Sequence, residues 1–457
     1  MTDVRTEHDS LGPLTVPAAA LWGAQTQRAV DNFPISGQPM PAAFITALAQ
    51  VKAACAQANQ ALGVVDEAIA AAIIEAAEAI VAGRHLDQFP VDVYQTGSGT
   101  STNMNANEVI ARLAGERLGR PVHPNDHVNA SQSSNDVIPT VTHVAVALAL
   151  ERQLLPALAR LTRCIRGRGA DLTNVIKTGR THLMDAMPLT LAQELSAWEA
   201  QIELGAARLR DAQPRLQAIA QGGTAVGTGI NAPAGFAETV AAELSARTGL
   251  RFTPAANRFE RLSSLGGVAE VSGQLKALAC DLMKIANDLR WMNSGPLAGL
   301  GEIELPALQP GSSIMPGKVN PVIPEAVCMV AARVIGNDAT VTVAAQSGNF
   351  QLNVMWPVTA AVMLESLQLL AAVVDLLARQ AIEGFKVREE VLRRAVDRNP
   401  ILVTALNREI GYEAGARIAK RAYAEGRPVL DVAIEETGMD REMLARLLDP
   451  SALVGPG

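Results

Sequence analysis

Four short polar segments interrupt an otherwise apolar chain, at residues 96–103, 131–136, 179–185 and 311–321. Each stands ahead of a stretch with a helical pattern of apolar residues. The third segment contains His182 and the fourth contains Lys318. Hydroxyl and amide donors, a lysine and backbone N–H groups at helix N-termini are the groups that bind a small anion with carboxylate groups. The four segments together therefore predict a site for a small carboxylate-bearing molecule.

Each segment taken alone also has a structural interpretation as a capped helix start, because Ser, Thr, Asn and Gly are ordinary capping residues. After the third segment, Pro188 has the residue type of a first helical turn and favours a helix that begins there. Asn320 and Pro321 likewise suit the start of a helix that carries Glu325. The fourth segment exceeds what a cap requires, since two glycines, two serines and Lys318 lie within residues 311–318. We therefore expect that segment to be functional.

Other ligand classes have weaker support in the sequence. Residues 96–103 approach the pattern G-x-G-x-x-G, but Thr102 replaces the last glycine and no strand is predicted before it, so a dinucleotide site is not expected. Residues 222–229 resemble a phosphate loop, but a threonine stands where its lysine is required. His123 and His127 are four residues apart, a spacing that could present both to one metal ion on a helix. Pro124 disfavours such a helix, so a solvated turn or an anion contact is the favoured interpretation.

The composition predicts a globular, helical protein. Of the 457 residues, 49% are hydrophobic and 19% are charged, which excludes a disordered chain. Aromatic residues make up only 3%, so Ala, Leu, Val and Ile must fill the core, and this favours packed helices over a β-sandwich. The formal net charge of −7 argues against nucleic acid as a partner.

The cysteines and the N-terminal sequence indicate a soluble, cytoplasmic protein. The four cysteines are far apart and form no C-x-x-C pair, so we expect free thiols in a reducing compartment and no zinc or iron–sulfur site. The N-terminus is polar and acidic, unlike a signal peptide. No run of about 18 uncharged apolar residues occurs that would suggest a membrane span. We therefore expect no membrane partner.

Long helices must position the polar segments. Helical stretches are predicted at 42–62 and 66–82, and farther along the chain apolar residues recur at spacings of three and four. The chain divides by character into residues 1–134, with mixed helices and loops, 135–388, a central helical bundle, and 389–457, a small polar helical domain. Alanines make the central helices apolar nearly all round, so we expect contacts between subunits to bury them rather than a large monomeric bundle. The recurring residues are Leu154, Leu158, Leu161 and Ile165, then Leu275, Leu278, Leu282, Ile285 and Leu289, and finally Leu367, Leu370, Val374 and Leu377.

With these segments in view, the chain resembles the class II fumarases of the fumarase/aspartase superfamily. The resemblance runs essentially end to end through the blocks LWGAQTQRAVDNFPIS, QTGSGTSTNMNANEVI, HPNDHVNASQSSND, GRTHLMDAMPLTL, GGTAVGTG and GSSIMPGKVNP, of which the last is the superfamily signature. Aspartase is the nearest alternative, and it typically has alanine at the position of Ser98 and Ser-Thr-Asn at residues 133–135. Both differences favour fumarase, although residues 322–325 are reminiscent of aspartases.

The resemblance implies a metal-independent lyase of the tricarboxylic acid cycle, which hydrates fumarate reversibly and stereospecifically to L-malate through an aci-carboxylate. By the same resemblance, Ser312 is the general base that takes the C3 proton. His182, oriented by Glu325, acts on the hydroxyl side. Lys318 and Asn320 stabilise the charge that develops on the aci-carboxylate. No metal or organic cofactor is implied.

The resemblance also implies two sets of binding residues and an assembly. Family members are homotetramers with a central bundle of long helices, and their active sites combine residues from three subunits, so we expect a three-domain fold whose bundle forms a tetrameric core. One set forms a second anion site of uncertain function, at Arg120, His123, Pro124, Asn125 and Asp126. The residues implied to bind the substrate are Ser98, Gly99, Thr100, Ser133, Ser134, Asn135, Thr181, Ser313, Lys318, Val319 and Asn320.

Two other functions stay open on the sequence. An aspartate ammonia-lyase would share the signature block, and the addition of ammonium to fumarate would reveal it. A structural or binding protein that kept the fold would bind a dicarboxylate without turnover. This last interpretation is disfavoured because every motif residue named above is present.

Overall fold

The computed structural model describes residues 3–455, and within them helices dominate. The strands in this range are short and pair two by two, β1 with β2, β3 with β4, β5 with β6 and β7 with β8. None of these pairs forms a layer of the core. The predicted all-α class is therefore confirmed.

The chain folds as two compact units, and each is assembled from three segments. The first comprises the described residues up to 156, together with 206–277 and 332–371. The second comprises residues 157–205, 278–331 and the described residues from 372 onwards. The division at residues 134 and 388 remains a prediction about domains.

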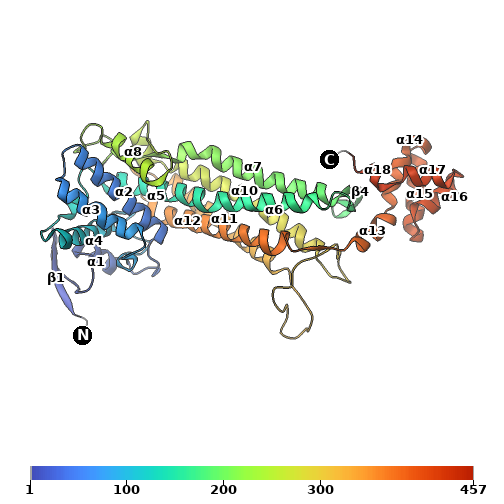
Figure 1. Cartoon of the computed structure of the whole chain (residues 1–457), viewed down its shortest axis with the longest axis horizontal. Helices are drawn as coiled ribbons and strands as arrows, with labels where there is room; N and C mark the ends of the chain where they lie inside the picture. The colour runs from blue at the N-terminus through green and yellow to red at the C-terminus, as the bar shows by residue number, and fades with distance from the viewer. Residues whose placement is uncertain (1–2, 456–457) are drawn as a thin grey trace. The chain divides into compact units, whose positions relative to one another are not determined.

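The first unit contains a layer of three adjacent helices, α2 (Ala42–Ala61), α3 (Glu67–Val81) and α4 (Thr100–Leu118), in which α3 packs against both others (Figure 1). The predicted helices at 42–62 and 66–82 are thereby confirmed. Asp66 caps α3, since its carboxylate accepts the backbone N–H groups of Ala68 and Ile69. The other elements that lie wholly within this unit are β1 (Val4–Asp9), β2 (Gly12–Pro17), α1 (Ala24–Asn32), η1 (Leu86–Gln88), η2 (Pro124–Val128), α5 (Ser134–Ala149), η3 (Leu150–Leu154), β5 (Ala218–Ile219), α8 (Phe236–Thr248), β6 (Thr253–Pro254) and α9 (Arg258–Ser263).

Five long helices begin within residues 135–388, the region predicted to be mainly helical. Every apolar residue of the predicted repeats is at most 1% exposed, so the spacing of three and four residues did identify the buried faces. The five helices are α6 (Leu155–Ala170), α7 (Leu191–Leu216), α10 (Gly266–Met292), α11 (Val322–Gln346) and α12 (Trp356–Leu377).

Helix α11 keeps much of its apolar surface exposed. By length and composition, α11 and the segment Trp356–Ile382 could each cross a membrane, as the core helices of soluble proteins also could. Half of the most apolar window of Trp356–Ile382 is buried, but only 33% of that in α11 is. Met329 and Val343 of α11 are 68% and 53% exposed. Within residues 3–455, these side chains are left without a covering layer.

The C-terminal helices form an apolar cluster of their own. Leu402, Leu406, Ile418, Val432 and Leu444 are buried together in it. The cluster explains how a segment rich in charged residues folds as a set of short helices. These elements are α13 (Glu389–Asp397), η5 (Pro400–Leu406), α14 (Asn407–Ile410), α15 (Tyr412–Glu425), α16 (Val429–Thr437), α17 (Arg441–Leu447) and α18 (Pro450–Leu453). Before them in the chain come β7 (Ile303–Glu304), η4 (Ala378–Ile382) and β8 (Lys386–Val387), of which β7 and β8 pair.

The third polar segment is a β-hairpin, and the prediction of a helix beginning at Pro188 is wrong. Strand β3 (Ile176–Thr181) pairs antiparallel with β4 (Met184–Thr190), in which Pro188 lies opposite Thr178. The two turn residues, His182 and Leu183, have φ of 55° and 62°, as a two-residue hairpin turn of this hand requires. Helix α7 follows at Leu191, and its start is capped by reciprocal hydrogen bonds between residues 190 and 193.

Candidate active site

The first polar segment places two hydroxyl groups at the N-terminus of α4. The Oγ of Ser98 lies 2.9 Å from the Oγ1 of Thr100, the first residue of the helix. The segment can approach its neighbours closely because it has glycine at two positions. A Cβ atom on Gly97 would lie 1.9 Å from the carbonyl oxygen of Val354, and Gly99 has a φ of 71°. The paired hydroxyls and the free N–H groups of the helix start can bind a water molecule or a carboxylate oxygen.

The second segment begins α5 with a capping box. The Oγ of Ser133 accepts the N–H of Asn135, and the N–H of Ser133 donates to Asp136 over 2.9 Å. The Asp136 carboxylate also accepts the backbone N–H groups of Gly222 and Thr224, each at 2.9 Å. Burial raises the pKa of Asp136 to about 6, although these N–H groups act to lower it. Asp136 thus fastens the second segment to residues 222–224.

The first two segments are neighbours. The Nδ2 of Asn103, in the first turn of α4, donates to the Oγ of Ser134 over 2.9 Å. The Nδ2 of Asn135 donates to the carbonyl oxygen of Ala225 over 2.8 Å, which fixes the orientation of its amide. Two helix N-termini and their hydroxyl and amide side chains therefore lie together, and such groups can bind an anion.

The third segment presents His182 at the tip of the β3–β4 hairpin. Thr181, His182 and Leu183 are all exposed there. Among the described residues no ion pair joins His182 to Glu325, so the predicted contact between the imidazole and this carboxylate is not formed within the chain.

A buried ion cluster anchors the base of this hairpin. The Nζ of Lys177 lies 2.6 Å from a carboxylate oxygen of Glu194 and 2.8 Å from one of Glu302, and Arg180 pairs with Glu302 as well. Lys177 and Glu302 are 1% and 3% exposed. Burial by itself raises the pKa of Glu302, but the hydrogen bonds and charges of Arg180 and Lys177 outweigh it and hold the pKa below its ordinary value. Glu302 was not predicted from the sequence, because it is 125 residues away from Lys177.

The fourth segment folds as a closed loop in which Ser312 accepts two backbone hydrogen bonds. The N–H of Gly311 donates to the carbonyl oxygen of Lys318 over 2.7 Å, and the Nδ2 of Asn320 donates to the carbonyl oxygen of Gly311 over 2.8 Å. The Oγ of Ser312 accepts the N–H groups of Ile314 and Met315 at 3.2 and 3.1 Å. Two donors directed at one hydroxyl oxygen favour its deprotonated form. Helix α11 follows at Val322, close to the predicted start.

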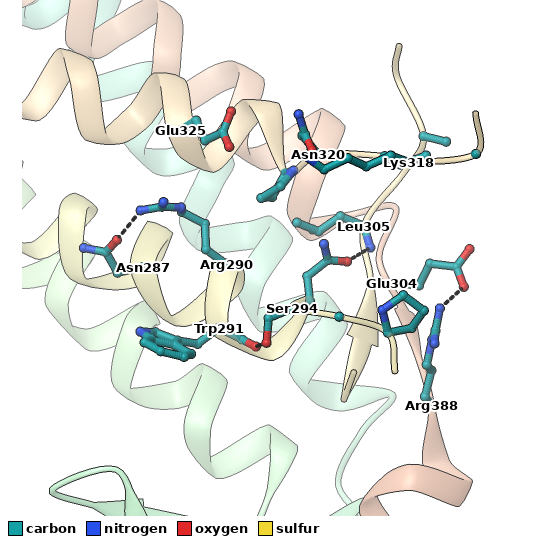
Figure 2. A pocket seen from close by; sticks show the side chains of 17 residues that line it. Asn287, Arg290, Trp291, Ser294, Glu304, Leu305, Lys318, Asn320, Glu325 and Arg388 are labelled. Atoms are coloured by element: carbon teal, nitrogen blue, oxygen red, sulfur yellow. Dashed lines mark hydrogen bonds and ion pairs between the residues drawn. The ribbon is translucent and has the colours of Figure 1, made fainter. Parts of the chain in front are cut away.

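Lys318, Asn320 and Glu325 line a cavity of about 720 Å³. Figure 2 shows Lys318 and Asn320 on the loop and Glu325 on the first turn of α11. Helix α10 contributes Arg290 to the cavity wall, and its Nη1 donates to Asn287 over 2.8 Å. Arg290 and Asn287 were not predicted from the sequence, because they lie within and directly after the apolar repeat that ends at Leu289, and this repeat indicates only a buried helix. The lining carries both cations and the carboxylates of Glu304 and Glu325. Ser312 does not line this cavity, but it lines a second pocket that shares Lys318.

The five residues of the implied second anion site lie on or beside η2, and three of them line a cavity in the first unit. These three are Arg120, His123 and Pro124. Proline opens η2, where its missing N–H needs no partner, and the turn brings the Nδ1 of His123 within 3.2 Å of Asp126. Asn125 lies in the same turn. Across residues 3–455, no group of three or more His, Cys, Asp or Glu residues is arranged to hold a metal ion.

Comparison with known proteins places the chain in a family. Residues 12–336 match the model of a lyase family, and residues 402–455 match that of the fumarase C C-terminus. A class II fumarate hydratase of Xylella fastidiosa is 60% identical over 99% of this chain and 96% of its own length. The chain belongs to the class II fumarate hydratase family.

Two further members agree with this. A second class II fumarate hydratase, from Pseudomonas aeruginosa, is 58% identical over the full length of both chains. The crystal structure of a class II fumarase from Schistosoma mansoni superposes with a TM-score of 0.97 at 35% identity, over 99% of this chain and 100% of that one. The predicted fumarase-like fold and the family's lyase class are thus confirmed, and the resemblance stated from the sequence blocks was correct.

Proposed function

We propose that this chain is a fumarate hydratase that adds water reversibly to fumarate to give L-malate. The observation that carries the proposal is the closed loop at 311–321, in which two backbone N–H groups donate to the Oγ of Ser312. The same loop carries Lys318 and Asn320, and Ser312 and Lys318 line one pocket. Full-length relatives with the same class name support it.

The difficult step is the removal of a proton from a carbon next to a carboxylate. It gives an aci-carboxylate with extra negative charge, so stabilising that charge is the main catalytic task. Lys318 supplies a positive charge at the cavity and Asn320 supplies an amide. In the proposed mechanism both contact this carboxylate in the transition state.

Ser312 acts as the general base that removes the C3 proton. An ordinary serine hydroxyl is too weak a base, because its anion is poorly stabilised at neutral pH. The N–H groups of Ile314 and Met315 stabilise the alkoxide by hydrogen bonds to the charged form. The same two donors keep the oxygen oriented.

His182 acts on the hydroxyl side of the substrate, where it protonates the leaving hydroxyl or activates the water. Glu325 orients the imidazole, and we propose that it does so from another subunit, because the two side chains form no ion pair within the described chain. Acid and base functions are thereby placed on separate loops.

The remaining residues position the two carboxylates and the water. The paired hydroxyls of Ser98 and Thr100 hold the water beside the N-terminus of α4, with Gly99 allowing the close approach. The other proposed substrate contacts come from the second, third and fourth segments, and they are Ser133, Ser134, Asn135, Thr181, Ser313 and Val319.

The proposed assembly is a homotetramer whose active sites combine residues of three subunits. The exposed apolar side chains of α11, including Met329 and Val343, give a face that another copy can cover. The four cysteines are unpaired, which supports the proposed cytoplasmic location. No metal or organic cofactor takes part in the proposed reaction.

The proposal is tested by the ultraviolet absorbance of fumarate after the purified protein is added to L-malate, with L-aspartate in a parallel cuvette. Fumarate from L-malate alone is the expected result. Fumarate from L-aspartate alone would instead identify an aspartate ammonia-lyase. No fumarate from either would contradict catalysis and indicate a binding protein.

A further inference from the structure

Helix α2 carries two buried polar side chains on one face. Lys52 and Asn59 are both 0% exposed. They are seven residues apart, which places them on the same side of the helix. The rest of the buried surface of α2 is almost entirely apolar, with many alanines. A fully buried ammonium group in such a helix calls for a physical reason.

Both side chains hydrogen-bond to the loop that leads into α5. The Nζ of Lys52 donates to the Oδ1 of Asn129 over 3.0 Å and to the Oε1 of Gln132 over 2.9 Å. The Nδ2 of Asn59 donates to the carbonyl oxygen of Ala130 over 2.9 Å, and its Oδ1 accepts the hydroxyl of Ser131. Four consecutive residues of the loop are therefore held by one face of α2.

The loop needs this support because its backbone is strained. Ser131 has a φ of 63°, in the left-handed region that residues other than glycine seldom adopt. Residues 133–135, which the proposed function assigns to the substrate carboxylates, begin two positions after Ser131. A loop that relaxed at Ser131 would move all three of them.

The hydrogen bonds continue from Lys52 to the proposed substrate residues. Besides Lys52, the Oδ1 of Asn129 accepts the Nδ2 groups of Asn103 and Asn107, each at 3.2 Å. Asn103 also donates to the Oγ of Ser134 over 2.9 Å. The side-chain oxygen of Asn129 thus accepts hydrogen bonds from both Lys52 and Asn103, and Asn103 in turn bonds to Ser134.

Stability alone does not account for Lys52. Burial lowers the pKa of Lys52 to about 7, although the Asp136 carboxylate acts to raise it, so the ammonium is disfavoured in this environment. Core packing would be served at least as well by an apolar side chain of similar volume. The hydrogen bonds to the loop are what the lysine adds.

We propose that Lys52 is a positioning residue, which holds residues 129–135 in the conformation that binds a substrate carboxylate by acting through Asn129 and Gln132. The proposal rests on the proposed function for the role of residues 133–135. It assigns Lys52 no contact with the substrate.

The test compares Lys52→Met with wild type, because methionine keeps the length of the side chain and removes its charge and N–H donors. We expect KM for L-malate to rise at least about tenfold with kcat changed less than about threefold, since carboxylate binding is lost rather than chemistry. Backbone amides of residues 130–135 should exchange with deuterium at least about tenfold faster in the variant.

Cys55→Ala is the matched control, because Cys55 lies between Lys52 and Asn59 on the same face, is fully buried and is not bonded to the loop. It should change neither KM nor the exchange rates by more than about twofold. Gln132→Met removes the loop's partner instead, and should raise KM in the same way. The double variant, with Lys52→Met and Gln132→Met together, should have a KM no higher than that of either single variant, as expected for residues that act through each other.

Wild-type KM and wild-type exchange rates in Lys52→Met would overturn the proposal. If Lys52→Met does not fold, Gln132→Met decides by the same two measurements. If wild type converts neither L-malate nor fumarate, the proposed function fails, and the exchange rates of residues 130–135 still decide for or against Lys52.

Discussion

At the scale of single residues, the proposed chemistry depends on the two backbone N–H groups that reach the Oγ of Ser312. Removing that oxygen removes the base without disturbing a packed core, because the loop from Ser313 to Val319 is exposed. Ser312→Ala should therefore lower kcat by at least about 10³-fold and leave the oligomer intact, since base catalysis and its electrostatic support are lost together. Steady-state kinetics and gel filtration check this. Near-normal turnover would exclude serine as the base.

Lys52 also makes a prediction about stability and pH. Burial lowers its pKa in the folded chain to about 7 from an ordinary value of 10.5, so between these values the unfolded chain binds more protons and stability rises with pH. From pH 7 to 8.5, the free energy of unfolding of wild type should increase by about 1 to 2 kcal/mol relative to Lys52→Met. Melting temperatures of both proteins across this range measure the difference. If the difference in free energy of unfolding between wild type and Lys52→Met stays the same from pH 7 to 8.5, Lys52 does not titrate in that range.

At the scale of elements, the β3–β4 hairpin owes its position to the cluster of Lys177, Glu194, Arg180 and Glu302. Glu302→Gln leaves the buried ammonium of Lys177 with less compensating charge, and should destabilise the protein by about 3 kcal/mol. It should also lower kcat about tenfold, because His182 at the hairpin tip is displaced. The control is Glu304→Gln, which breaks the exposed pair with Arg388 and should change stability by less than about 1 kcal/mol. Equal effects of the two substitutions would contradict an anchoring role for Glu302.

The elements that were predictable from the sequence are those with a strong local pattern. The helices at 42–62 and 66–82 and the buried repeats around Leu158, Leu282 and Leu370 follow from spacing alone. The hairpin at 176–190 was not predictable in this way, because its turn uses His182 and Leu183 at positive φ, where asparagine and glycine are the usual signals.

The residue types of the candidate site were predictable from the sequence, but the residues that hold its loops in place were not. Capping and loop residues such as Ser133 and Ser312 are recognisable by their neighbours in the chain. Glu302 and Lys52 act on loops that are at least 77 residues distant. Only the folded chain brings such partners together. From the sequence alone, a lysine in an alanine-rich helix is predicted to be exposed to solvent.

At the scale of the whole molecule, the exposed apolar face of α11 is consistent with the proposed active site shared between subunits. The lack of an ion pair between His182 and Glu325 within the described residues is consistent with it as well. Ser312→Ala and His182→Asn should each be nearly inactive alone. In mixed tetramers co-expressed with two different affinity tags, about a quarter of the sites should regain both residues if these come from different subunits, which closed symmetric assembly allows. Turnover by the doubly purified protein measures this. Mixed tetramers as inactive as either parent would place both residues on one subunit.

The most direct test of the central claim is the hydration of fumarate by wild type in D₂O, followed by proton NMR. Water is the second substrate and the C3 proton comes from solvent, so the product reports the reaction and its stereochemistry together. We predict L-malate with a single deuteron on one face of C3, as anti addition by a fixed base requires. No malate, or malate with deuterium distributed over both faces of C3, would contradict the account.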